Sequence, residues 1–96
     1  MMFPKPEIYR DENYLDFIRS KPCCNPDCNC SDTIAHHEDI LKSGGTGIKA
    51  HDYLTLSLCV NCHNLRHSIG RAMFNGILDI EKEMIKLLME YIHEQN

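Results

Sequence analysis

The sequence predicts a small α+β domain whose core is a strand, a loop, a second strand and a helix. The first observation is a run at residues 32–38 of the type found in short strands, Thr-Ile-Ala followed by two histidines. The second is residues 52–58, where leucines alternate with polar residues at the period of a half-buried strand. The third is the segment 60–71, predicted to be a helix that ends near Gly70. Its two histidines then share one face.

We predict that residues 1–96 form one domain with a small core. Residues 1–22 would be an N-terminal arm with a short helix, residues 23–72 the core, and residues 77–95 a C-terminal helix. Domains of this size are often stabilised by a bound metal or by dimerisation. Metal ligands or an apolar seam between two copies are therefore expected in this chain.

The N-terminal part is predicted to be extended before it becomes helical. Pro4 and Pro6 discourage regular structure in residues 1–13. Residues 14–20 have the amphipathic spacing of one or two helical turns, and Pro22 would end them.

Residues 41–50 contain three glycines within four positions, so a regular strand or helix is not expected there. We predict a flexible loop that joins the two strands. It is either a plain connector or a segment that approaches a phosphate backbone with Lys42 and Lys49.

Asn75 and Gly76 break the chain before the C-terminal helix. One face of that helix is apolar, and it would either pack on the core or form the seam of a homodimer. The residues of this stripe are Ile77, Ile80, Met84, Leu87, Leu88 and Tyr91.

Six cysteines in so short a chain indicate either a disulfide framework or a zinc site. The N-terminus has no apolar segment typical of a signal peptide, and no run is long enough to cross a membrane. We therefore expect a reducing, cytoplasmic location in which the thiols are metal ligands. An extracellular disulfide domain is the weaker alternative.

The C-x-x-C pair at residues 59–62 has the spacing of a zinc knuckle, and two of the four thiols in residues 23–30 would complete the site. We favour the pair separated by four residues, because that spacing leaves room for a turn. Cys30 in place of Cys28 is the main alternative, and Cys24 could also replace one of the pair. The two cysteines left over are expected to be spare thiols. The predicted ligands of a closed, structural zinc site are Cys23, Cys28, Cys59 and Cys62.

The histidines predict a second, open site. His36 and His37 are adjacent in a strand and so point to opposite faces, which suits one metal ligand and one general base. A pair of surface histidines is the alternative. His63 and His67, four apart on a helix, would share a face and begin a nitrogen site.

Taken together, residues 23–67 resemble the HNH endonuclease family in its zinc-containing ββα-metal form, and most closely its small phage and prophage members. The matching pieces are the cysteine knuckle, Ala35-His36-His37, the glycine loop, a polar residue before the second strand, and the run from Leu58 to His67. The resemblance implies a ββα-metal core, a bacterial or phage origin, and hydrolysis of DNA phosphodiester bonds.

The resemblance also implies roles for individual residues. His37 would be the general base, and His36 and His63 would bind a catalytic Mg²⁺ or Mn²⁺. His67 would add a further ligand or contact the scissile phosphate. Asp52 stands nearest to the asparagine with which the family orients the base, and an aspartate there could still accept from the imidazole N–H.

The formal net charge of −4 argues against a simple basic nucleic-acid binder. Most of this acidity lies in residues 77–96, however. The expected DNA-phosphate contacts are Arg66, Arg71, Lys42 and Lys49. A non-catalytic zinc module that binds DNA or protein is the alternative function, but it leaves the histidines without a role.

Overall fold

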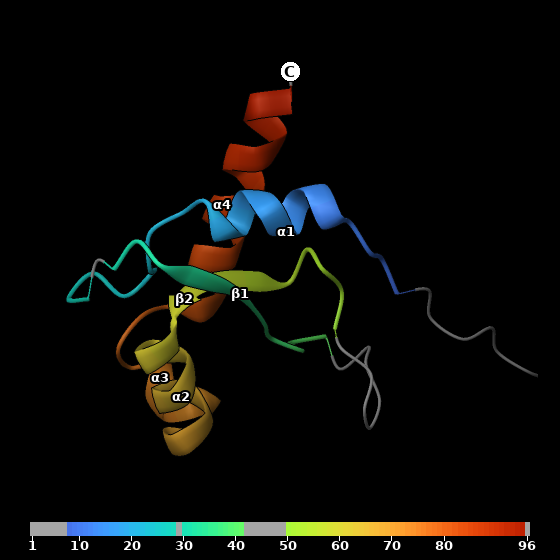
Figure 1. Ribbon diagram of the computed structural model, residues 1–96. Helices are drawn as coiled ribbons and strands as arrows, with labels where there is room; N and C mark the ends of the chain where they lie inside the picture. The colour runs from blue at the N-terminus through green and yellow to red at the C-terminus, as the bar shows by residue number, and fades with distance from the viewer. Residues whose placement is uncertain (1–7, 29, 42–49, 96) are drawn as a thin grey trace, which may run out of the picture.

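The computed structural model describes residues 8–28, 30–41 and 50–95, and its α+β class is the predicted one. A two-stranded antiparallel sheet lies at the centre, with α1 on one side and α2 and α3 on the other (Figure 1). The elements are α1 (Glu12–Arg19), β1 (Thr33–His37), β2 (Thr55–Cys59), α2 (Val60–Ile69), α3 (Arg71–Phe74) and α4 (Ile80–Gln95). The predicted glycine loop, with Lys42 and Lys49, lies outside the described residues.

The register of the sheet determines what meets at each of its ends. Thr33 pairs with Cys59, and His37 pairs with Thr55. The start of β1, which follows the first cysteine segment, therefore lies beside the C-x-x-C pair. The end of β1 lies beside the segment that carries Asp52.

Strand β2 is buried along its whole length, whereas its alternating pattern predicted a half-buried strand. Thr55 and Ser57 are as fully buried as Leu56 and Leu58. Their hydroxyls are satisfied: Thr55 donates to the carbonyl of Asp52 at 2.9 Å and Ser57 to the carbonyl of Pro22 at 2.8 Å. The polar face therefore packs inside the protein because the backbone supplies acceptors there.

Helix α1 begins two residues earlier than predicted, because Asp11 is its N-cap and accepts from the backbone N–H of Tyr14 at 3.1 Å. Its apolar face is the expected one, with Tyr14 and Ile18 fully buried. The ring of Tyr14 meets the ring of Tyr91 edge to face at 4.9 Å, which joins α1 to α4.

The described part of the predicted arm is bound to the chain ahead of β2. The backbone N–H of Asp52 donates to the carbonyl of Tyr9 at 3.0 Å, and the Tyr9 N–H donates to Nδ1 of His51 at 2.9 Å. Residues 9–11 are thus held in place by partners some forty positions away.

Helix α2 ends at Gly70, as predicted, and the positive φ of 86° there is one that glycine adopts without strain. The short helix α3 was not predicted. Its residue Phe74 is fully buried, so α3 brings the chain back to the core.

Helix α4 begins at Ile80, three residues after the predicted start. The preceding residues make turns instead, in which the N–H of Ile77 donates to the carbonyl of Phe74 at 2.9 Å. Asp79 then accepts from the N–H of Lys82 at 3.2 Å, in the manner of a helix cap.

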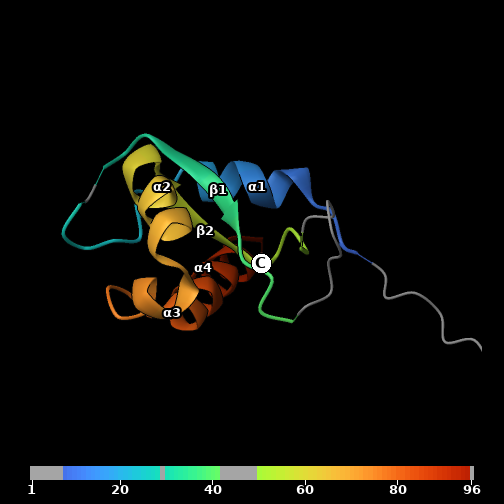
Figure 2. The same cartoon turned by 90° about the horizontal axis from the view of Figure 1, so that it is seen from below.

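The apolar stripe of α4 packs within the chain, apart from Ile77, which is 40% exposed. Ile80, Met84 and Leu87 are buried, and Leu88 and Tyr91 pack against them. Figure 2 shows the helix beneath the sheet. A second apolar line, Ile85, Met89 and Ile92, was not part of the predicted stripe and is exposed. No helix in the described ranges is long and apolar enough to span a bilayer.

Candidate metal sites

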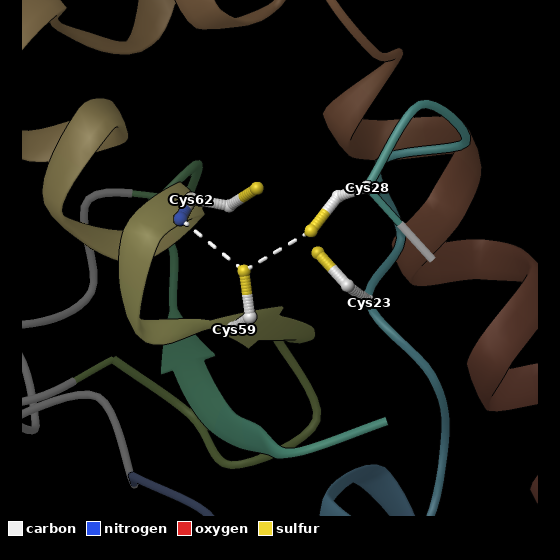
Figure 3. Close-up of side chains that lie close together, drawn as sticks. All are labelled: Cys23, Cys28, Cys59 and Cys62. Atoms are coloured by element: carbon white, nitrogen blue, oxygen red, sulfur yellow. Dashed lines mark hydrogen bonds between the residues drawn. The ribbon is translucent and has the colours of Figure 1, made fainter. Parts of the chain in front are cut away.

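The structure gathers the four predicted cysteines into one cluster. Their sulfur atoms all lie within 4.8 Å of one another, and Figure 3 shows them pointing to a common centre. Two come from the segment before β1, one from the end of β2 and one from α2. Four thiols in this arrangement could hold a metal ion such as zinc, which prefers four-coordinate sulfur sites when its role is structural.

Local structure prepares one sulfur for this role. Cys59 is the N-cap of α2, and its sulfur accepts from the backbone N–H of Cys62 at 3.5 Å. That hydrogen bond lowers the pKa of Cys59 to about 7 against the opposing effect of burial. Burial raises the pKa of Cys62 to about 12, so a cation bound there would release a proton at neutral pH.

The other two cysteines lie outside the cluster. The sulfur of Cys24 is 3.4 Å from the hydroxyl of Ser57, and that of Cys30 is 3.9 Å from the carbonyl of Asp32. Cys28, and not the alternative Cys30, therefore completes the set of four sulfurs.

Three histidines form a second cluster. His36 comes from β1, whereas His63 and His67 are one turn apart on α2. One ring nitrogen from each lies within 4.8 Å of the others, and Nδ1 of His36 is 2.9 Å from Nδ1 of His63. Burial, followed by the nearby charges of His36 and His67, lowers the pKa of His63. The neutral form that a metal ion requires is therefore favoured at neutral pH.

The strand alternation separates the partners of His36 and His37, as predicted. Nε2 of His37 lies 2.9 Å from Oδ1 of Asp52, which is buried and fixed from other directions. The backbone N–H of Asp11 donates to its Oδ2 at 2.7 Å, and Nη1 of Arg10 lies 3.2 Å from its Oδ1. Burial alone would raise the pKa of Asp52, but the hydrogen bonds from His37 and Asp11 and the charge of Arg10 lower it.

The three-histidine cluster and His37 border one open hollow of about 270 Å³. Its lining residues are Ala35, His36, His37, His63 and His67. A ligand in this hollow would meet the imidazole cluster and His37 together.

Glu38 is a buried charge that sequence reasoning missed. It is 1% exposed, and its carboxylate contacts His36, Arg66 and Arg71. Burial alone would raise the pKa of Glu38, but hydrogen bonds from His36 and Arg66 lower it to about 2. The sequence did carry one signal for the contact between Glu38 and His36. The two residues lie two positions apart at a strand, and residues with that spacing share a face.

The expected phosphate contacts have different surroundings. The side chain of Arg66 is only 15% exposed and bonds to Glu38 through two nitrogens. The side chain of Arg71 is 41% exposed and makes one such bond.

The fold and the cysteine cluster define a small α+β domain with a site able to hold a structural metal ion. The family model described as "Protein of unknown function (DUF968)" matches residues 1–76, and the chain belongs to this family. The uncharacterized protein YdfU of Escherichia coli (strain K12) is 34% identical over 68 residues, which are 71% of this chain and 19% of YdfU. The chain thus spans about a fifth of the length of this relative. No solved structure matches this chain.

The expected membership of the HNH family is therefore wrong. The matching family and the relative are both described as proteins of unknown function, and neither is an HNH protein by description. The pieces that carried the resemblance are short ligand patterns, such as C-x-x-C and two histidines four apart. Such patterns follow from the geometry of metal binding and do not distinguish one family from another.

Proposed function

We propose that the domain is a metal-dependent DNA endonuclease in which His37 is the general base. The observation that carries this proposal is the shared hollow: His37, held by Asp52, borders the same opening as the three-histidine cluster. Hydrolysis of a phosphodiester needs a base near neutral pKa together with positive charge on the phosphate, and the hollow offers a place for both.

The contact between His37 and Asp52 supports the role of base. A carboxylate only accepts hydrogen bonds, so Nε2 of His37 carries the proton that points to Asp52. The lone pair of the neutral ring then lies on Nδ1, which is free to take a proton from water. Asp52 would fix this tautomer and stabilise the ring when it becomes charged.

The imidazole cluster supports binding of a divalent ion by His36 and His63, with His67 as a third nitrogen. Nitrogen ligands suit transition ions, whereas Mg²⁺ prefers oxygen and keeps several waters. Of the two expected ions, Mn²⁺ is therefore better suited to these nitrogen ligands. When bound, such an ion would supply Lewis-acid stabilisation of charge on the phosphate. The strands β1 and β2 and the helix α2 together form the proposed ββα unit that holds it.

Two guanidinium groups that contact the carboxylate partners of His36 and His37 support a phosphate-bearing substrate. Arg71 contacts Glu38, which in turn contacts His36, and Arg10 contacts Asp52. Their side chains are 41% and 47% exposed, so both could meet a DNA backbone. Most of the net negative charge lies instead in residues 77–96, in α4 and the turn before it, beyond the family match.

The test is nicking of supercoiled plasmid by the zinc-loaded protein with Mn²⁺, with Mg²⁺ and with EDTA. We expect nicked circles with Mn²⁺, a rate at least about 100-fold lower for His37→Ala, and no change for His93→Ala, an exposed histidine of α4. No cleavage with either metal, or equal cleavage by His37→Ala, would reject the proposal. A folded protein that binds DNA without cutting it would favour the non-catalytic zinc module.

A further inference from the structure

Glu38 is placed on the same side of the sheet as His36. The residue follows β1 directly, and its backbone N–H continues the strand pairing by donating to the carbonyl of Leu54 at 2.9 Å. Two positions separate it from His36, so the strand period directs both side chains to one face. Both side chains are buried there, at 1% and 4% exposure.

The contacts of Glu38 determine its charge state. One oxygen accepts from Nε of Arg66, and the other accepts from Nη2 of Arg66 at 2.9 Å and from Nε of Arg71 at 3.1 Å. A carboxylate bound by two guanidinium groups is ionised, because arginine remains charged in proteins. It therefore has acceptors only.

This charge state determines the tautomer of His36. Its Nε2 lies 3.0 Å from Oε2 of Glu38, so Nε2 must be the donor. The lone pair of the neutral imidazole then lies on Nδ1, the nitrogen that is 2.9 Å from His63. Hydrogen bonds of this kind to a metal-binding histidine fix its ring and raise its basicity as a ligand.

We propose that Glu38 is a positioning residue that holds His36 in the tautomer and orientation that present Nδ1 to a divalent transition ion shared with His63 and His67. The inference rests on the proposed function for the purpose of the site, but ion binding can be measured without any activity. A purely structural role is the competing explanation, since Arg66 and Arg71 also tie α2 and α3 to β1.

The first experiment measures Mn²⁺ affinity by electron paramagnetic resonance of the free ion, with zinc retained on the cysteines of the full chain. Glu38→Gln should bind Mn²⁺ about 10- to 100-fold more weakly than the wild type, with unchanged zinc content and circular dichroism. Arg71→Gln, which removes one ion pair of Glu38 and leaves His36 untouched, should retain the wild-type affinity. Equal losses in the two variants, or no Mn²⁺ binding by the wild type, would overturn the proposal.

The second experiment needs no variant, so it holds even if Glu38→Gln fails to fold. Long-range ¹H–¹⁵N correlation spectra of the wild-type protein report which nitrogen of His36 carries the proton. We expect protonation at Nε2 alone, and a proton on Nδ1 would overturn the proposal. A protein that cuts no DNA but whose Mn²⁺ affinity depends on Glu38 would reject the endonuclease and support the positioning role.

Discussion

The sulfur of Cys59 accepts a hydrogen bond from the backbone N–H of Cys62 at 3.5 Å, so one cysteine of the cluster is also the N-cap of α2. The same sulfur lies 3.3 Å from that of Cys28. Strand, helix and cysteine segment thus meet at one atom. The stability of the domain should depend on what that atom binds.

The substitution Cys59→Ser separates the effect of losing a metal ligand from the effect of losing the helix cap, because serine is itself a good N-cap. We expect zinc content to fall from about one ion per chain to nearly none, since a hydroxyl is a poor zinc ligand. The midpoint of thermal unfolding should fall by more than about 10 °C. Metal analysis and circular dichroism measure the two effects. The matched control is Cys30→Ser, and zinc loss from this control would contradict the four-sulfur assignment.

Asp52→Asn should lower the free energy of unfolding by about 2 kcal/mol at pH 7, because charge-assisted hydrogen bonds from His37 and Asp11 are weakened. The pKa of Asp52 is lowered in the fold, so its contribution is complete above the ordinary aspartate range and is lost as pH falls through the lowered pKa. The difference between the two proteins should therefore shrink below about pH 4.

Urea unfolding of the two proteins at neutral pH and at about pH 3 tests this dependence. Both proteins keep the same cysteines, so the difference cancels the acid sensitivity of the thiolate site. Asp32→Asn, at an exposed position, is the matched control and should change the free energy of unfolding at neutral pH by less than about 0.5 kcal/mol. A gap for Asp52→Asn that stays constant on acidification would contradict the lowered pKa.

Asp11→Ala should destabilise the protein by about 1 to 2 kcal/mol, because it removes the N-cap of α1. It also leaves the hydroxyl of Tyr53, which donates to Asp11 at 2.6 Å, without that acceptor. Asp11→Asn keeps a capping oxygen and should lose much less. Asp16→Ala, in the exposed part of the same helix, is the matched control. Equal urea midpoints for the Asp11→Ala and Asp16→Ala proteins would argue against the cap.

Leu87→Ala and Ile85→Ala distinguish the buried and exposed faces of α4. The first should cost about 2 to 4 kcal/mol, since Leu87 is 7% exposed. The second should change stability by less than about 0.5 kcal/mol, since Ile85 is 58% exposed. The predicted seam stripe packs within the chain, so the same pair tests a homodimer on the exposed line of α4 instead: a seam at Ile85 would make the melting midpoint rise with protein concentration in the wild type and not in Ile85→Ala.

Local pattern was sufficient for most of the elements. The alternation around Leu56 predicted β2, and the glycine at position 70 predicted the end of α2, because both depend on a few neighbouring residues. The start of α4 was predicted too early, since the turn at Ile77 depends on the burial of Phe74.

The sequence by itself determined which residues can bind ions. The C-x-x-C pair and the two histidines of α2 are neighbours through backbone geometry alone, and adjacency in a strand separates the partners of His36 and His37. Family membership did not follow from such short patterns.

Only the tertiary structure decided the partners that come from far along the chain. It selected Cys28 over Cys30, brought Asp11 to Asp52, and placed Glu38 between His36 and two arginines. It also buried the polar face of β2 by supplying the carbonyl of Pro22. These contacts depend on the strand register and on helix packing, which join segments that no local period relates.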